Sequence, residues 1–160
     1  MKNYIRCFFF FIALLLLAGC STNDKKYENW QTIVLEDLGT IKFPDDWSIS
    51  KKDNYIYVYD ATQDPVMVQS FSYCGISEDH PVGKQETNEL YTIQNIRYLT
   101  SEVFSNGAVI GTVDCTIDNE ECEKLYLSME LGETEYLFIV VNDNINYDQL
   151  KEIAKTFELD

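Results

Sequence analysis

One apolar run near the carboxyl end constrains the fold more than any other part of the sequence. Residues 136–141 read Tyr-Leu-Phe-Ile-Val-Val, with apolar or aromatic side chains on both parities of an extended strand. Successive side chains of a strand point to opposite faces of its sheet, so both faces of this strand must be buried. We therefore expect a central strand covered on both faces, with a helix as the cover of the second face.

Turn residues beside strand-like runs indicate antiparallel hairpins. Asn106-Gly107 and Gly132-Glu133 each separate two such runs, and both dipeptides favour tight hairpin turns. The four hairpin strands are predicted at residues 97–105, 108–117, 124–131 and 134–141. Shorter strands, rich in β-branched and aromatic residues, are predicted at residues 32–36, 40–43, 55–59 and 65–73.

The last segment of the chain carries a helical signature. Its apolar stripe has the spacing i, i+3, i+4, i+7 and consists of Leu150, Ile153, Ala154 and Phe157. Asn146 is a suitable N-cap with Gln149 three residues on, and Ile145 can pack on Leu150. A weaker stripe predicts a mid-chain helix over residues 85–95. This order of elements predicts an α+β fold, an antiparallel β-sheet with helices packed on it.

The first nineteen residues have the composition of a secretory signal peptide. Lys2 and Arg6 precede an apolar run over residues 8–18, and small residues then lead to Cys20. The run is eleven residues long, whereas a spanning helix needs about 20, which disfavours the alternative of an uncleaved anchor. We expect a signal peptide at 1–19, the lipidated cysteine with a flexible linker at 20–29, and one domain at 30–160, long enough for its own core.

Residues 17–20, Leu-Ala-Gly-Cys, match the lipobox of bacterial lipoprotein signal peptides residue for residue. This resemblance implies cleavage before Cys20 and a diacylglyceryl thioether on its sulfur. Two acyl chains hold a protein stably at a bilayer, at about 0.8 kcal/mol per buried methylene. We therefore expect a lipoprotein anchored to the cell membrane through Cys20, on the extracytoplasmic side.

The mature chain is strongly acidic. Cleavage removes two basic residues and no acidic ones, which takes the net charge from −15 to −17. An anionic bilayer repels such a domain, but a linker of nine residues spans about 15–18 Å, beyond a screening length of about 8 Å. The domain is thus expected to be tethered near the membrane without lying on it. The same charge argues against a nucleic-acid partner.

Three cysteines remain once the signal peptide and the lipidated residue are set aside, namely Cys74, Cys115 and Cys122. Export permits disulfides, and Cys115 and Cys122 flank a turn-like segment. However, in the predicted strand 108–117 the apolar residues alternate in step with Cys115, so Cys115 belongs to the apolar face. In the next predicted strand, 124–131, the apolar residues alternate out of step with Cys122, so Cys122 belongs to the other face. This pattern places the two thiols on opposite faces. We therefore predict no bridge between them, unless a bulge in the turn shifts the register.

The most suggestive surface feature is a strip of alternating tyrosines, Tyr55, Tyr57 and Tyr59. Alternation places all three on one face of a strand, and tyrosine is enriched at protein interfaces. We take the strip as a candidate binding surface. The alternative is that its rings pack in the core under a helix.

Two other groups of residues are weighed as chemical sites. Calcium ligands could come from Asp114, Asp118, Asn119, Glu120, Glu121 and Glu123. They lack the spacing and glycine of an EF-hand, which favours a solvated hairpin tip and no metal. Cys74 and His80 could pair as thiol and imidazole, but no nucleophile motif surrounds them. No nucleotide-binding or hydrolase motif is present, so we predict a non-enzyme without a cofactor.

A family resemblance involves both ends of the domain. Residues 41–47, Ile-Lys-Phe-Pro-Asp-Asp-Trp, resemble the Phe-x-Pro-x-x-Trp start of PsbP-like and DcrB-like domains. The run 136–141, followed by Asn142-Asp143 and a helix ending near Phe157, is similar to their ending. The resemblance implies an α/β/α sandwich and non-catalytic roles in assembly, docking or envelope maintenance. It implies no catalytic residue, because the family shares none.

Together these patterns predict an envelope lipoprotein whose single module binds or positions a protein or envelope component. Two alternatives stay open. One is capture of calcium or another solute by acidic loops, and the other is hydrolysis at a site without a recognised motif.

Overall fold

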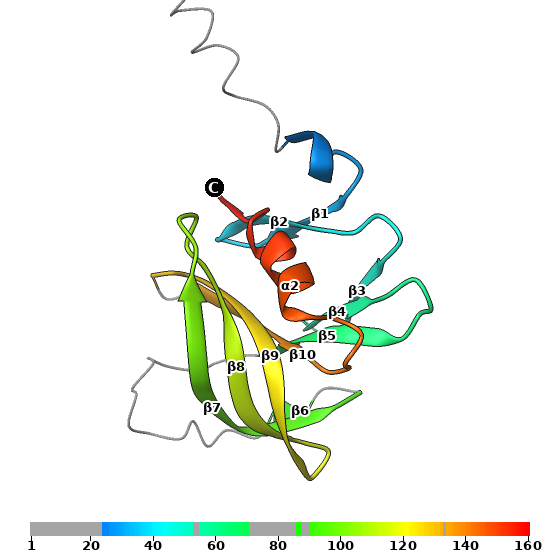
Figure 1. Ribbon diagram of the computed structural model, residues 1–160, viewed down its shortest axis with the longest axis vertical. Coiled ribbons are helices and arrows are strands. Elements are labelled where there is room, and N and C mark those ends of the chain that lie inside the picture. The colour runs from blue at the N-terminus through cyan, green and yellow to red at the C-terminus, as the bar shows by residue number, and fades with distance from the viewer. Residues whose placement is uncertain (1–23, 53–54, 71–85, 88–89, 133) are drawn as a thin grey trace, which may run out of the picture. The chain divides into compact units, whose positions relative to one another are not determined.

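The computed structural model describes residues 24–52, 55–70, 86–87, 90–132 and 134–160 (Figure 1). The chain divides into two compact units, Met1–Trp30 and Gln31–Asp160. The described part of the first unit holds one 3-10 turn, η1 (Asp24–Tyr27). The Trp30 ring packs edge-on against Tyr27, with ring centroids 4.9 Å apart. The segment predicted as a flexible linker therefore contains one ordered turn.

The described residues of the second unit form two antiparallel sheets and one helix. The small sheet has the order β1-β2-β11 and the large sheet the order β3-β4-β5-β10-β9-β8-β7-β6. The strands of the small sheet are β1 (Gln31–Leu35), β2 (Gly39–Phe43) and β11 (Glu158–Leu159). Those of the large sheet are β3 (Ser48–Lys52), β4 (Tyr55–Tyr59), β5 (Pro65–Ser70), β6 (Glu86–Thr87), β7 (Thr92–Val103), β8 (Ala108–Ile117), β9 (Glu120–Leu131) and β10 (Thr134–Val140). The antiparallel pairing is confirmed, and the α+β class is confirmed in part, since strands dominate and α2 (Tyr147–Ala154) is the only α-helix in the described residues.

The closing helix, α2 (Tyr147–Ala154), is also confirmed. The Asn146 side chain accepts a hydrogen bond from the Gln149 amide at 3.0 Å, and the Gln149 side chain accepts one from the Asn146 amide at 3.0 Å. This reciprocal pair satisfies two of the backbone donors that a helix start leaves without partners. Leu150, Ile153 and Ala154 are buried beneath the helix, as the apolar stripe predicts.

The central strand lies where its double-sided apolar pattern predicts. β10 is hydrogen-bonded to β5 on one side and β9 on the other, and Leu137, Phe138 and Ile139 are fully buried. On the first face, α2 contacts β8, β9 and β2, and the Phe43 ring contacts the Phe138 ring with centroids 6.3 Å apart. The small sheet and α2 together therefore cover this face.

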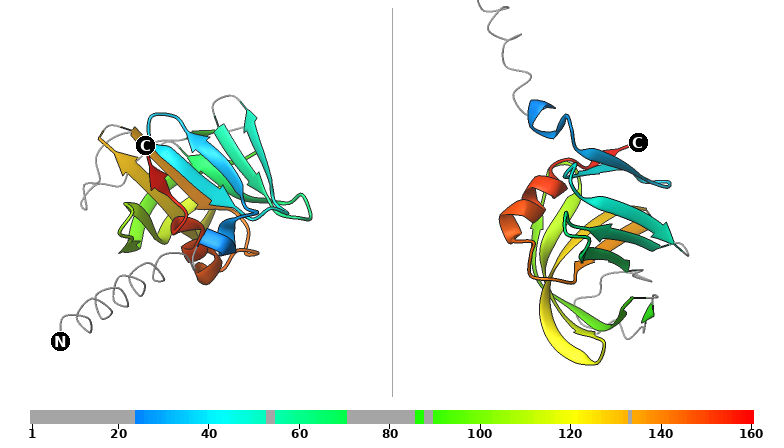
Figure 2. Two further views of the ribbon diagram at one scale, coloured as in Figure 1. Left: turned by 90° about the horizontal axis from the view of Figure 1, so that it is seen from above. Right: turned by 90° about the vertical axis from the view of Figure 1, so that its right-hand side faces the viewer.

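The closing helix thus supplies the cover expected for one face of β10, whereas the other face is covered by the sheet itself, with no helix over it in the described residues. β7, β8 and β9 curl strongly, so that β6 and the start of β7 lie beneath β4 and β5 (Figures 1 and 2). The curl encloses a second hydrophobic core, which contains Ile93, Val113, Cys115, Tyr126, Leu137 and Ile139.

The mid-chain helix predicted over residues 85–95 is wrong in the described positions. Glu86–Thr87 form β6, and Thr92 already begins β7. Asn95 has a left-handed φ of 55°, and the β7–β8 register shifts between Gln94 and Arg97. Such a bulge bends its strand, which lets β7 follow the curl.

Candidate functional site

The three tyrosines of the strip on β4 differ in how deeply they are buried. Tyr57 pairs with Val68 on β5, and the rings of Tyr55 and Tyr57 lie 6.4 Å apart, on the same face of β4. The Tyr57 side chain is only 3 % exposed, so it packs in the core as in the alternative interpretation. Tyr55 and Tyr59 are half-buried. Only these two outer tyrosines therefore offer surface to a partner.

The second half-buried tyrosine lies close to the start of β7. Burial raises the pKa of the Tyr91 phenol, and the nearby Asp118, Tyr59 and Asp64 raise it further. These groups come from opposite ends of the large sheet in its strand order, and the curl brings them together. The surface around Tyr59 thus belongs to the rim of the second core.

Two carboxylates of the acidic β8–β9 hairpin make structural contacts. Arg97 forms an ion pair with Asp114 across β7 and β8. The Asp118 carboxylate accepts a hydrogen bond from the Thr92 amide at 2.8 Å, which ties the hairpin turn to the start of β7. Within the described ranges, no three His, Cys, Asp or Glu side chains come together as a metal-binding group.

Three of the residues weighed from the sequence lie outside the described residues. They are the lipidation site Cys20 and the pair Cys74 and His80.

The prediction that Cys115 and Cys122 lie on opposite faces is wrong. They are direct partners across β8 and β9, and their sulfur atoms are 3.8 Å apart. The cause is the turn: Ile117 pairs with Glu120, and the two residues between them, Asp118 and Asn119, have φ of 51° and 72°. A two-residue turn of this kind pairs residues of opposite parity.

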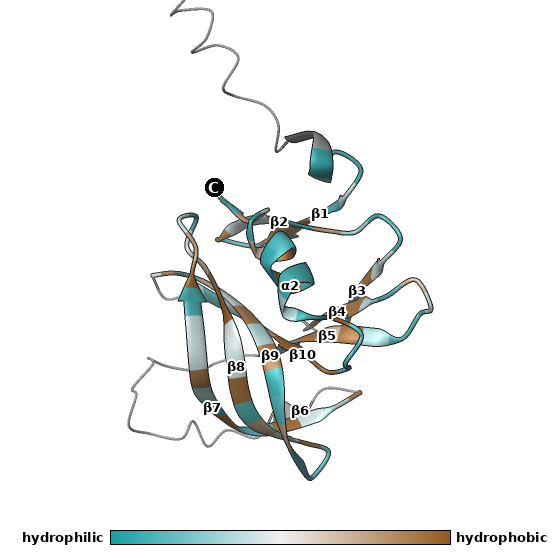
Figure 3. Cartoon of the chain, viewed as in Figure 1, coloured by the Kyte–Doolittle hydropathy of each residue, from teal (hydrophilic) through white to brown (hydrophobic). Residues whose placement is uncertain are grey.

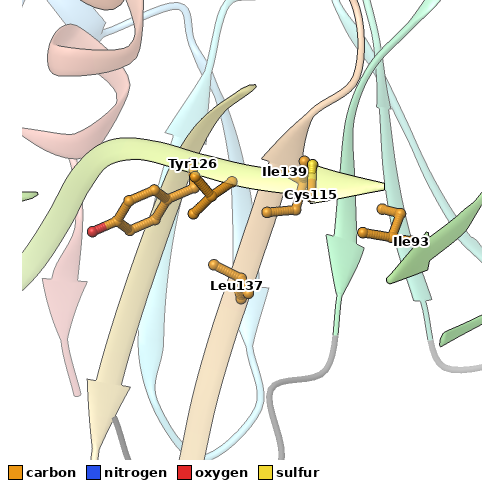
Figure 4. Close-up of a cluster of buried hydrophobic side chains, with 6 residues drawn as sticks. Ile93, Cys115, Tyr126, Leu137 and Ile139 are labelled. Carbon is orange, nitrogen blue, oxygen red and sulfur yellow. The ribbon is translucent and has the colours of Figure 1, made fainter. Parts of the chain in front are cut away.

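The parity argument failed because β8 buries opposite faces along its length. Ala108 and Ile110 are buried under α2 at one end, whereas Val113 and Cys115 are buried inside the curl at the other. Figure 3 shows the apolar and polar residues along the strands. Figure 4 shows Cys115 beside Ile139 and Ile93 in the second core. Burial, with Cys122 close by, raises the pKa of the Cys115 thiol to about 12.

Sequence reasoning missed one surface, the outer edge of β7. β6 pairs with this edge only at Thr92 and Ile93, and β8 occupies the other edge. Among the described strands, none pairs with the outer edge over residues 94–103. Two apolar side chains stand out there, Leu99 at 42 % and Val103 at 71 % exposure. The sequence pattern predicts a strand at residues 97–105, but it does not say which strands lie beside it. The unpaired edge is therefore seen only in the strand order of the sheet.

The helix behind this edge holds β7 in place. Glu102 accepts hydrogen bonds from the Tyr147 hydroxyl at 3.0 Å and from Lys151 Nζ at 2.9 Å, both on α2. The hydrogen bonds from Lys151 and then Tyr147 lower the pKa of Glu102, and the bond to Glu102 raises the pKa of Lys151. The end of β7 is therefore fixed to the helix, while its outer edge faces away from β8.

Comparison of the chain with protein-family models, with curated proteins and with solved structures gives no significant match. No helix in the described ranges combines the length and the apolarity that a membrane crossing requires.

Proposed function

We propose that the protein is a lipid-anchored, extracytoplasmic binding module that recruits another envelope protein by strand addition at β7, without catalysing a reaction. The observation that carries this proposal is the edge of β7 over residues 94–103, which no described strand covers, with its exposed Leu99 and Val103. Sheet edges bind extended segments through backbone hydrogen bonds, while side-chain contacts give specificity.

The backbone of this edge has the alternation that strand addition needs. The Phe104 amide donates to the Ala108 carbonyl at 2.8 Å, which closes the β7–β8 loop. Hydrogen-bonded and non-bonded pairs alternate along an antiparallel ladder. Ser101 and Val103 therefore direct their backbone N–H and C=O groups away from β8. An incoming strand would pair with these groups and cover the two apolar side chains.

Charge suggests the chemistry of the partner. The mature chain carries a net charge of −17 after cleavage, which favours a segment bearing Lys or Arg and disfavours acidic competitors. The expected ligand is thus an extended, basic segment with apolar residues at alternate positions.

The lipobox supports the location. The compact unit begins at Gln31, the eleventh residue after Cys20, which leaves a short tether. We also propose a distant relationship to the PsbP-like and DcrB-like sandwich. The succession of β2, the turn at Pro44, the central β10 and the closing α2 supports it.

The anchor is tested by Cys20→Ala with membrane fractionation and metabolic acyl labelling. We expect the wild type in the membrane fraction with an acyl label, and the variant to lose both. Cys74→Ala is the matched control and should keep both. An unlabelled wild type with an unchanged membrane signal would refute the anchor.

The binding edge is tested by photo-crosslinking in cells that express the full chain. A photoreactive residue in place of Ser101 should give one discrete adduct with an envelope protein, and the same residue in place of Val34 on β1 should not. Leu99→Lys with Val103→Lys should abolish the adduct. Equal adducts from both positions, or an adduct that survives the double substitution, would contradict strand addition.

A further inference from the structure

We propose that Cys115 and Cys122 are joined by a disulfide in the exported protein, and that Cys122 is the thiol that first meets the oxidant. The inference rests on the proposed extracytoplasmic location, because disulfides persist in oxidising compartments. It makes this pair a modification site at the far end of the β8–β9 hairpin.

The geometry of the pair fits a bridge. Directly opposed residues of an antiparallel ladder have Cα atoms about 4.5–5.5 Å apart, inside the range of about 4.4–6.8 Å that disulfides span. The two sulfurs are 3.8 Å apart, on the same face of the hairpin. A disulfide needs them at about 2.05 Å, which rotation of the side chains can supply without a change of register.

Burial sets the order of the two thiols. Cys122 is partly exposed, whereas Cys115 is 4 % exposed and packs with the second core. The high pKa of the Cys115 thiol keeps it protonated near neutral pH, which agrees with a late role for this sulfur. The positive charge of Lys124 opposes part of this rise in the pKa of Cys115.

The chemistry is a two-electron thiol–disulfide exchange with an external disulfide as the oxidant. The Cys122 thiolate attacks one sulfur of that disulfide, which forms a mixed disulfide and releases one thiolate, protonated by solvent. Cys115 then loses its proton to solvent and attacks Cys122 Sγ, which releases the second thiolate. The protein pair is oxidised to one S–S bond, and the external disulfide is reduced to two thiols.

The bond would fix the outer end of the curl. β8 and β9 carry three members of the second core, namely Val113, Cys115 and Tyr126, and Cys122 packs against it. Joining the strands next to the Asp118-Asn119 turn holds this wall of the core together. The oxidised protein is therefore expected to open less readily at this end.

The test equilibrates the full chain, purified in detergent, in glutathione buffers from reducing to oxidising. Free thiols are then blocked with N-ethylmaleimide, and trypsin releases residues 98–124, which contain both cysteines. Under oxidising conditions we expect this peptide as a monomer, two hydrogen masses lighter and without maleimide. Under reducing conditions both cysteines should carry maleimide. Two free thiols in oxidising buffer, or a bridge between two chains, would overturn the proposal.

Two single variants test the order of the thiols. In Cys115→Ser, Cys122 should accumulate a stable glutathione adduct. In Cys122→Ser, glutathione should add to Cys115 more slowly by about tenfold or more, because burial restricts access to that thiol. Equal rates would overturn the assignment of Cys122 as the first thiol.

Acid trapping of the thiols in intact cells separates this inference from the proposed function. A bridge that forms with glutathione and is found in cells supports both. If it forms with glutathione but the cellular protein is reduced, the extracytoplasmic location is what fails. Failure with purified protein overturns the disulfide, whatever the location.

Discussion

The side-chain amide of Asn106 donates a hydrogen bond to the Ala154 carbonyl at 2.9 Å, which connects the β7–β8 loop to the end of α2. The same amide donates to the Phe157 carbonyl at 2.9 Å, and the Asn106 side-chain oxygen accepts from the Ala108 amide. One side chain therefore shapes the loop and satisfies carbonyls at and beyond the helix end, groups that have no partner within a helix.

Asn106→Ala should therefore lower the free energy of unfolding by about 1–3 kcal/mol, because the Phe157 carbonyl loses its side-chain donor and the Ala154 carbonyl is left with the Phe157 amide at 3.2 Å. The measurement is urea unfolding followed by circular dichroism. Asn144→Ala is the matched control. Asn144 is exposed and bonds only at the surface, so its loss should cost no more than about 0.5 kcal/mol. Equal losses from the two variants would contradict the role of Asn106.

The contact between Glu102 and Lys151 predicts a pH dependence of stability. The folded pKa of Glu102 lies below its usual value of 4.5, so its contribution is present above that value and is lost as pH falls through the folded pKa. The folded pKa of Lys151 lies above its usual 10.5, so its contribution is present below that value and is lost as pH rises through the folded pKa.

Glu102→Gln should therefore be less stable than the wild type by a constant amount across neutral pH. The difference should shrink as pH falls below 4.5, where the wild-type carboxylate gains its proton. Urea unfolding at pH 7 and at acid pH measures it. Glu121→Gln on β9 is a control without this contact and should track the wild type at both. A difference that grows on acidification would refute the assignment.

A close approach of two strands makes Gly111 necessary. A Cβ at this position would lie 1.9 Å from the Thr100 carbonyl oxygen and 2.9 Å from the Tyr126 ring. The first neighbour is backbone, so β7 and β8 must separate to admit a methyl group. Gly111→Ala should cost about 1–3 kcal/mol in urea unfolding. Ser101→Ala, at the directly opposed and exposed position, should cost within about 0.5 kcal/mol. A neutral Gly111→Ala would show that the strands are farther apart.

Local signals in the sequence predicted the elements that depend on neighbouring residues. The capping of α2 by Asn146 and Gln149 involves residues three apart, and the Asn106-Gly107 turn is also local. The central β10 was predicted from burial on both faces. These features can be predicted without the positions of distant parts of the chain.

The features that the sequence did not predict depend on distant parts of the chain. Leu90, Ile93 and Ile96 match a helical period, but pairing of β7 with β8 and packing of Ile93 in the curl override that pattern. Whether Cys115 and Cys122 face each other depends on the length of the β8–β9 turn, because a shift of the register by one residue moves every side chain of a strand to the other face. The open edge of β7 depends on the strand order of the whole sheet.

The cysteine pair gives the last prediction, an effect of reductant on thermal stability. A bond from Cys115 to Cys122 closes a short loop, and loop closure of this size stabilises by about 2 kcal/mol in the chain-entropy model. For a domain of this length, that corresponds to a rise of about 4–8 °C in Tm. Oxidised protein should therefore melt higher than the same sample after reduction, as measured by circular dichroism. The double variant Cys115→Ala with Cys122→Ala should show no such change. A reductant effect of equal size in the double variant would place its origin elsewhere in the chain.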